Sequence, residues 1–494
     1  MESAEKLKPE VAPEAPSTDR RVRFVSSERP PSTRANDLPV GSPPIEASPA
    51  REVFLLAWPM AAAMFGETAI GLVDTFLVSG LGAGALGGVG YASTLMFLGY
   101  SLVYGLMRGV KVRVSHATGE GTPEKHPRYL VAGLILSTAV GVVVWAISRD
   151  VTWFLVWTKT DPLVLPFARD SLRAVTWGAP FSCALAAMTH YRQGLGDSQS
   201  PMVVGLLGNL FHGILGWALI YGHLGLPALG VPGAGYATAV TEALEVAALG
   251  ALVLRDELRR PGARSDLSLL AAIREVSEIG VPTGVQFVCE MLAFTTFTAI
   301  LGSIGAVEIA AHQIAINVLR VSFLPGIALS EAASVLIGRA LGARDVPRAD
   351  RVNRATLGLA VGFMAVCGLG FAVLARPVAR AFTDDLAVAA VTVHLLWLAS
   401  VFQVMDAVNI VLRGSLRAAK DVRVVAFVGI VVAWTCIPAA GWYFGKALGL
   451  GALGGWLGFI AETTLAGSIL WVRWHRGAWR RAYAPLDADR AGGS

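Results

Sequence analysis

The segment LGLPALG at residues 224–230 recurs as LGLGALG at residues 448–454, shifted by 224 positions and identical at six of seven. A nearly equal offset, 223, separates Pro59 from Pro282, and each proline lies near the start of an apolar stretch. A register that holds within one residue over most of a chain indicates an internal repeat. We therefore interpret the sequence as a duplication of one unit.

Each copy of this unit contains six apolar stretches of about 20 residues, the length that a helix needs to cross a bilayer. In lipid such stretches must be helical, because the backbone has to satisfy its own hydrogen bonds. The composition agrees: 54% of the 494 residues are apolar, 16% are charged and the mean hydropathy is +0.57. We predict twelve transmembrane helices, at residues 54–78, 89–110, 130–149, 165–189, 201–221, 233–254, 277–301, 310–338, 354–375, 388–412, 423–443 and 452–472.

The expected fold is therefore an all-α polytopic membrane protein made of two six-helix parallel repeats. Because six is even, both copies have the same orientation, and the axis that relates them lies along the membrane normal. With both termini on one side, that side collects 33 of the 41 Lys and Arg residues and the other side 7. The positive-inside rule then predicts that both termini are cytoplasmic.

The chain divides by composition into two lobes with polar segments around them. Residues 1–50 hold nine of the 25 prolines and a single aromatic residue, which predicts a disordered cytoplasmic tail. The predicted parts are this tail, an N-lobe at 51–254, a cytoplasmic linker at 255–276, a C-lobe at 277–475 and a basic cytoplasmic tail at 476–494. Two six-helix lobes in one orientation suit a transporter in which both move around a central site.

Several functional classes find no support in the sequence. A net charge of +5 is too small for a nucleic-acid-binding surface. The motifs of P-loop ATPases, zinc proteases and serine hydrolases are absent, so we expect neither an enzyme nor a cofactor. The four cysteines lie in apolar segments without a paired motif, and we interpret them as buried thiols.

Carboxylates inside predicted spans are the candidate functional groups, since each costs about 2.5–3.5 kcal/mol at the bilayer centre. Glu67 and Asp74 lie seven residues apart on the first helix, so they share a face about 10.5 Å apart along the axis. Glu290 occupies the repeat position of Glu67. Such acids could coordinate a dehydrated cation, exchange protons, or brace helices through hydrogen bonds.

Asp406 has amide neighbours, Gln403 and Asn409, one helical turn away on either side. Carboxylate and amide oxygens on one face suit a small cation. We therefore include all three in the candidate site.

Other charged residues have more than one interpretation. Arg108 and Glu331 occupy one repeat position on the second and eighth helices, so they could pair between the lobes as a gate, or Arg108 could extend to the cytoplasm. We interpret Glu242 and Glu245 as helix-bracing acids. Arg320, deep in a span, is expected to pair with an acid.

Three further segments are short motifs that occur along the predicted helices in a defined order. They are Gly71-Leu-Val-Asp74 in the first helix, Gln193-Gly-Leu-Gly-Asp197 after the fourth, and Ala310-Ala-His-Gln313 in the eighth. Over residues 52–475 the chain resembles the multidrug and toxic compound extrusion (MATE) family, in its NorM-like branch. The order and spacing of the motifs in both repeats carry the resemblance.

The resemblance implies a secondary antiporter that expels cationic, lipophilic small molecules in exchange for Na⁺ or H⁺. For the NorM-like branch it implies that Asp74, Glu290 and Asp406 carry the coupling ion and are candidate Na⁺ ligands. For other family members it implies an N-lobe site, in which Asn209 and Thr238 would join Asp74. We expect a monomer in a bacterial inner membrane, with membrane lipids and the substrate as partners and no nucleic acid. The alternative, a flippase for a lipid-linked precursor, is disfavoured because the deep charges are mainly acidic.

Overall fold

The computed structural model describes residues 48–158, 160–258 and 265–483, all within one compact unit. Most of the predicted tail 1–50, part of the predicted linker 255–276 and the end of the predicted tail 476–494 lie outside these residues.

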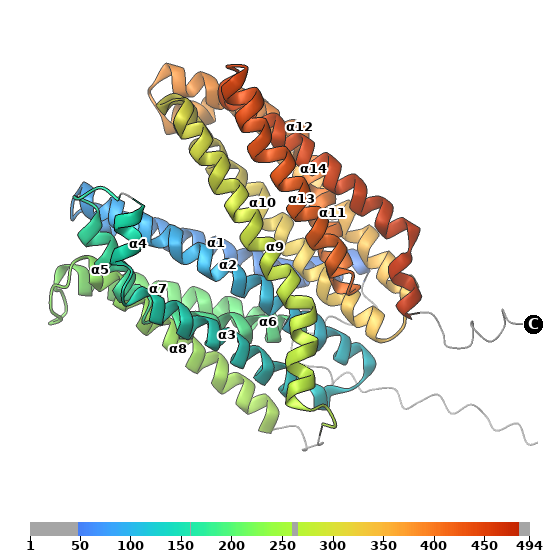
Figure 1. Ribbon diagram of the computed structural model, residues 1–494. Helices are drawn as coiled ribbons and strands as arrows, with labels where there is room; N and C mark the ends of the chain where they lie inside the picture. The colour runs from blue at the N-terminus through green and yellow to red at the C-terminus, as the bar shows by residue number, and fades with distance from the viewer. Residues whose placement is uncertain (1–47, 159, 259–264, 484–494) are drawn as a thin grey trace, which may run out of the picture. The chain divides into compact units, whose positions relative to one another are not determined.

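The first half of the chain forms eight helices among the described residues (Figure 1). They are α1 (Pro49–Ser79), α2 (Ala83–Glu120), α3 (His126–Ser148), α4 (Thr152–Trp157), α5 (Leu165–Val175), α6 (Ala179–Gly194), α7 (Gln199–Tyr221) and α8 (Val231–Leu258). The short 3₁₀ helix η2 (Pro123–Lys125) precedes α3. These helices make up the N-lobe.

The second half forms six α-helices, which make up the C-lobe. They are α9 (Leu269–Ile304), α10 (Ala306–Gly342), α11 (Val346–Phe382), α12 (Leu386–Ala418), α13 (Val422–Ala440) and α14 (Gly451–Arg476). A π-helical turn, η3 (Gly441–Ala447), continues α13, and a 3₁₀ helix, η4 (Ala478–Tyr483), follows α14. Eleven helices of the described chain are long and apolar enough to cross a membrane. The one remaining predicted span, the fourth in chain order, corresponds to α5 and α6 together.

The fourth predicted span, 165–189, is broken into α5 and α6 at residues 176–178. Pro180 explains the break, since it has no N–H to donate to the carbonyl of Thr176 and its ring crowds that carbonyl. Gly178, the residue before α6, packs closely against Glu242 of α8. The expected single helix is thus two shorter ones that meet inside the N-lobe.

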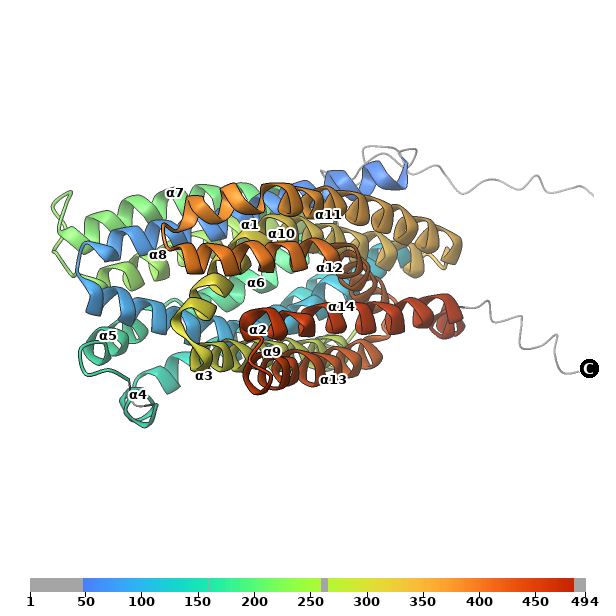
Figure 2. The ribbon, with the colours of Figure 1, turned by 90° about the horizontal axis from the view of Figure 1, so that it is seen from above.

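Helix pairings in the N-lobe are repeated in the C-lobe. Helix α1 packs on α7 as α9 packs on α13, and α7 packs on α8 as α13 packs on α14. Likewise α2 packs on α3 as α10 packs on α11. Seen from above in Figure 2, the long helices of both lobes run roughly left to right, whereas Figure 1 shows the two lobes diverging toward one end. The packing confirms the two six-helix repeats inferred from the sequence.

The lobes meet through small residues of α2 and α9. A Cβ atom on Gly105 of α2 would overlap the backbone of Gly284 in α9, and one on Gly109 would overlap the carbonyl of Val276. Such close helix contact requires glycine. These glycines lie in the C-terminal half of α2 and the N-terminal half of α9, and we name this end of the lobe interface the closed end.

The cysteines differ in part from the expectation. All four thiols are free, as predicted, but only Cys183 is buried, whereas Cys289, Cys367 and Cys436 are half-buried. The physical reason is that apolar spans of a membrane protein need only one buried face, so an apolar segment does not imply a buried position.

Candidate functional site

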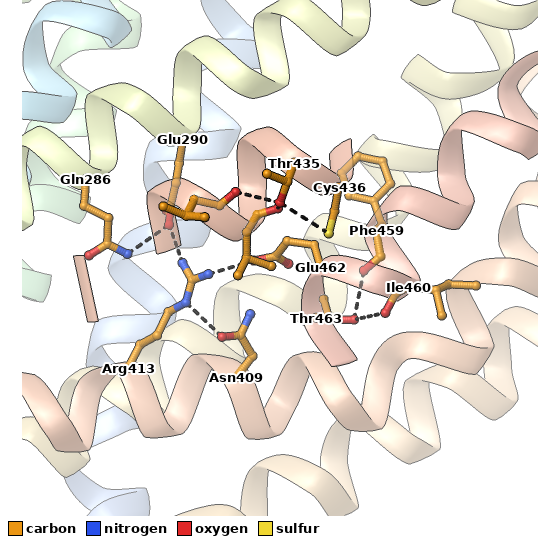
Figure 3. Close-up of polar contacts among 12 residues, drawn as sticks. Gln286, Glu290, Asn409, Arg413, Thr435, Cys436, Phe459, Ile460, Glu462 and Thr463 are labelled. Atoms are coloured by element: carbon orange, nitrogen blue, oxygen red, sulfur yellow. Dashed lines mark hydrogen bonds and ion pairs between the residues drawn. The ribbon is translucent and has the colours of Figure 1, made fainter. Parts of the chain in front are cut away.

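The C-lobe contains a cluster of acids built around one arginine (Figure 3). Arg413 of α12 donates from Nη1 to Glu290 of α9 at 2.6 Å and from Nη2 to Glu462 of α14 at 2.7 Å. Its Nε donates to Asn409 Oδ1 at 2.9 Å, and Gln286 donates to Glu290 at 2.9 Å. The Arg413 side chain is only 13% exposed, so the cluster lies inside the lobe.

Arg413 was not among the candidates from the sequence. The tenth span was predicted to end at residue 412, which assigned Arg413 to a cytoplasmic loop, whereas α12 continues to Ala418. Its spacing is the signal that could have revealed it, because Arg413 lies four residues after Asn409 and seven after Asp406.

Asp406 lies near this cluster without joining it through a hydrogen bond. The charges of Glu462 and Arg413 act on Asp406, but no hydrogen bond or ion pair links its carboxylate to another described residue. Gln403 turns elsewhere, since its Nε2 donates to Ser322 Oγ of α10 at 2.6 Å. The structure therefore brings Asn409 and Asp406 toward Arg413 and separates Gln403 from them.

The N-lobe contains a second cluster, in which the helix-one acid has a histidine partner. His212 Nε2 of α7 lies 2.8 Å from Asp74 Oδ1 of α1. His212 is only 4% exposed, while the Asp74 side chain is 29% exposed. This histidine was also missed from the sequence, because its role depends on the packing of α1 against α7.

The remaining N-lobe candidates occupy α1, α7 and α8. Asn209 of α7 packs against Gly66, the neighbour of Glu67, so Asn209 and the exposed Glu67 belong to the same helix contact. Thr238 of α8 is half-buried, and its hydroxyl donates at 3.1 Å to the carbonyl of Ala234 in its own helix.

Two glutamates of α8 extend this cluster. Glu245 packs against Gly208 of α7, and the charges of Glu67 and His212 act on it. Glu242 packs against Gly178, and its Oε2 is buried with no partner in the described chain. A bracing role for Glu242 therefore leaves this oxygen unsatisfied.

The two clusters differ in how their negative charge is balanced. In the C-lobe, Glu290 and Glu462 share the guanidinium of Arg413. In the N-lobe, no Lys or Arg among the described residues forms an ion pair with Glu67, Asp74, Glu242 or Glu245, and His212 is the one basic partner. The N-lobe cluster can therefore accommodate an added positive charge.

The candidate Na⁺ ligands do not form one site. Asp74 lies in the N-lobe cluster, whereas Glu290 and Asp406 lie in the C-lobe. Across the described ranges, no three His, Cys, Asp or Glu side chains are grouped so that they could hold a metal ion. Between Glu290 and Glu462 the residues present do not fit a metal ion, because Arg413 already supplies the positive charge there.

A third group of charges lies at the closed end. Arg108 Nη2 of α2 pairs with Glu331 Oε1 of α10 at 2.5 Å, and Lys111 contacts the other carboxylate oxygen of Glu331. Glu331 is 8% exposed and Lys111 is fully buried. The ion pair between repeat-related positions, one of two interpretations of Arg108, is therefore present.

Further bonds join the lobes at the same end. His116 Nε2 of α2 lies 2.8 Å from the carbonyl of Ala418, Arg113 pairs with Glu275 of α9 at 3.3 Å, and Arg348 pairs with Glu52 at 3.0 Å. Every hydrogen bond and ion pair that we find between the lobes, within the described chain, lies at the closed end.

The expectation for Arg320 was wrong. Its side chain is exposed on α10 and pairs with no acid in the described part of the chain. An exposed guanidinium can be hydrated, and hydration removes the need for an acid partner.

Comparison with known proteins identifies close relatives. The MatE family model matches residues 59–218 and again residues 282–440, once in each half. The probable multidrug resistance protein NorM of Burkholderia pseudomallei is 30% identical over 475 residues, covering 93% of this chain and 98% of the relative. The multidrug resistance protein MdtK of Edwardsiella ictaluri is 28% identical over 438 residues, covering 86% of this chain and 95% of the relative.

A solved structure also matches. A MATE transporter crystallised in the straight conformation superimposes with a TM-score of 0.80 at 19% identity, covering 90% of this chain and all of that one. This likeness shows a common fold. The two matches of the family model begin 223 residues apart, the same offset as the predicted repeat.

Proposed function

Because the chain belongs to the MatE family of multidrug and toxic compound extrusion transporters, we propose that it exports lipophilic organic cations in exchange for H⁺ or Na⁺. It is an integral membrane protein and a transporter, not an enzyme. The names of its relatives, multidrug resistance proteins of bacteria, support drugs as substrates and the inner membrane as its location.

The observation that carries the proposal is the uncompensated acidity of the N-lobe. Glu67 and Asp74 of α1 lie near Glu245 of α8, and His212 of α7, which contacts Asp74, is the one basic group paired with these acids among the described residues. A carboxylate in a membrane interior is stabilised by a cation or by protonation. An organic cation and the coupling ion would therefore compete for these carboxylates, and such competition couples the two fluxes.

The C-lobe cluster has a different role in this proposal. Arg413 acts as a resident cation that is paired with both Glu290 and Glu462. Asp406, which lacks such a bond among the described residues, remains the C-lobe candidate for the coupling ion. Both lobes then carry acids that no arginine pairs with, but the N-lobe offers several of them together, whereas the C-lobe offers Asp406 and holds Glu290 and Glu462 on Arg413.

Access would alternate by opening and closing the two ends of the lobe interface. If the termini are cytoplasmic, as the distribution of Lys and Arg supports, the closed end would face the cytoplasm. The structure would then represent a state open to the outside, in which Arg108–Glu331 acts as part of the inner gate. Opening to the cytoplasm would require separation of this pair and of the α2–α9 contact.

A flippase for a lipid-linked precursor is not favoured. Binding a pyrophosphate would need free basic groups, whereas Arg108, Lys111 and Arg413 are engaged with Glu331, Glu290 and Glu462.

The test is transport of a fluorescent organic cation in proteoliposomes with an imposed H⁺ or Na⁺ gradient. We expect the fluorescent cation to move in the direction opposite to the flow of H⁺ or of Na⁺, and not to move without a gradient. Equal transport with and without either gradient would reject antiport.

A further inference from the structure

Two arginines lie side by side where α3 ends and α5 meets α6, and they bond each other's backbone. Arg149 Nη2 donates to the carbonyl of Arg173 at 2.7 Å, and Arg173 Nη2 donates to the carbonyl of Arg149 at 3.0 Å. Arg149 also donates to Thr176 Oγ1 at 2.6 Å, to Ser148 Oγ at 3.2 Å and to the carbonyl of Trp145 at 3.3 Å. The pair is therefore held in place by short polar bonds rather than left free.

Neither guanidinium has an acidic partner among the described residues. Asp150 is exposed and pairs with neither arginine, and Asp170 is bonded to Arg169 at 3.0 Å. Burial and the neighbouring Arg173 charge both lower the pKa of Arg149. Two like charges fixed together without a counter-ion are unfavourable, and a bound anion would relieve the repulsion.

Donors remain available for such an anion. The bonds described above use Nε and Nη2 of Arg149 but not Nη1. For Arg173 they use Nη2, while Nε is buried without a partner in the described chain. A guanidinium presents its donors as a planar fork that matches the oxygens of a phosphate. The unused donors of two adjacent forks suit one such group.

The surroundings are those of a membrane surface. The Arg149 guanidinium lies 5.4 Å from the ring of Trp145 and 5.1 Å from that of Trp177. Trp177 is 48% exposed, and Ile147, two residues before Arg149, is 62% exposed. Tryptophans favour the level of lipid headgroups, and exposed aliphatic side chains on a spanning helix face acyl chains.

We propose that Arg149 and Arg173 form a binding site for a phosphate group, supplied by a phospholipid headgroup or by free phosphate. The site lies at the opposite end of α3 from the closed end, and in our topology it faces the outer leaflet. Guanidinium groups bind phosphate oxygens through paired, charge-assisted hydrogen bonds. A bound phosphate would tie the end of α3 to the break between α5 and α6.

Native mass spectrometry of the purified transporter tests the proposal, with phosphatidylglycerol and a diacylglycerol of the same acyl chains as probes. We expect the protein to retain phosphatidylglycerol and not diacylglycerol. Arg173→Gln should weaken phosphatidylglycerol binding by about five-fold or more, since one basic residue at a membrane surface contributes about 1 kcal/mol. The control Arg169→Gln, on the same helix with a half-buried side chain, should bind as the unmodified protein does.

A second variant and a second probe keep the test decisive. Arg173→Lys retains the positive charge, so it should bind better than Arg173→Gln. Inorganic phosphate at the same concentration identifies the source: failure to displace the lipid assigns the site to a headgroup, and displacement that depends on Arg173 assigns it to free phosphate. Equal retention of diacylglycerol, or unchanged binding in both Arg173 variants, would overturn the proposal.

Discussion

Arg108 and Glu331 occupy the same position in the two copies of the repeat, 223 residues apart, and their side chains pair across the lobe interface at 2.5 Å. A residue can touch its own repeat counterpart only close to the axis that relates the copies. The duplicated position has thus diverged into a basic group in one lobe and an acidic group in the other. Lys111 contacts the same carboxylate, so Glu331 joins two cations of α2 to α10.

Replacing Glu331 with glutamine should destabilise the closed end. The change leaves Arg108 and Lys111 buried without their partner, and loss of one member of a buried ion pair costs about 3–5 kcal/mol. We expect a lower melting temperature and greater labelling of a cysteine introduced on the facing side of α9. Glu278→Gln is the control, because Glu278 is half-exposed and its partner Arg113 also pairs with Glu275. Equal stability of the two variants would show that Glu331 does not secure this end.

Adding a methyl group to Gly105 should separate the lobes. Its Cβ would overlap the backbone of Gly284, which cannot move without shifting α9. Overpacking of this kind costs about 1–3 kcal/mol. Gly90→Ala is a matched control on the same helix, since nothing lies within 4 Å of its Cβ position. Thermal unfolding in detergent measures both variants, and a Gly105→Ala protein as stable as the control contradicts the contact.

Arg413 should be required for the thermal stability of the C-lobe, because it neutralises two acids. Arg413→Met leaves Glu290 and Glu462 without their basic partner, so we expect a loss of thermal stability. Removing one of these charges as well, in the double variant Arg413→Met with Glu290→Gln, should restore part of the loss. Thermal unfolding of the single and double variants measures the coupling, and strictly additive losses would contradict a shared ion pair.

Trp479 should stabilise the packing of η4 against the end of α14. It is 4% exposed, its ring centroid lies 4.4 Å from that of Trp474 at a tilt of 30°, and its Nε1 donates to the Trp474 carbonyl at 3.1 Å. Truncating a buried tryptophan costs about 3–5 kcal/mol, so Trp479→Ala should lower the melting temperature clearly. Arg481→Ala, two residues away and exposed, should have little effect. A Trp479→Ala protein that melts with the control would show that η4 contributes no stability.

The sequence was sufficient for the spans and the repeat, because bilayer thickness sets helix length and a duplication leaves a constant offset. It could not predict the partners of the acids. Glu67 and Glu290 are repeat-related, yet Glu290 bonds Arg413 while Glu67 has no basic partner in the described chain. Arg413 was missed because a loop boundary was placed at residue 412, one position before it. The Asp74–His212 contact was missed because it depends on how α1 packs against α7.

The break between α5 and α6 was only partly predictable from the sequence. Pro180 is visible in the sequence, and a proline inside a span predicts a kink. Prolines also lie inside α1 and α9, however, where the helix continues through Pro59 and Pro282. Proline alone therefore did not distinguish a bend from a break.

The central claim is that cation exchange depends on the uncompensated acids of the N-lobe. Its most direct test is gradient-driven transport of a fluorescent cation in proteoliposomes containing the Asp74→Asn protein. The control is Asp170→Asn, in which a half-buried acid outside the cluster is changed. We predict that Asp74→Asn loses at least about ten-fold in rate, the equivalent of about 1.4 kcal/mol, while Asp170→Asn transports normally. Transport by Asp74→Asn at the unmodified rate, under the same gradient and at equal reconstitution, would contradict the claim.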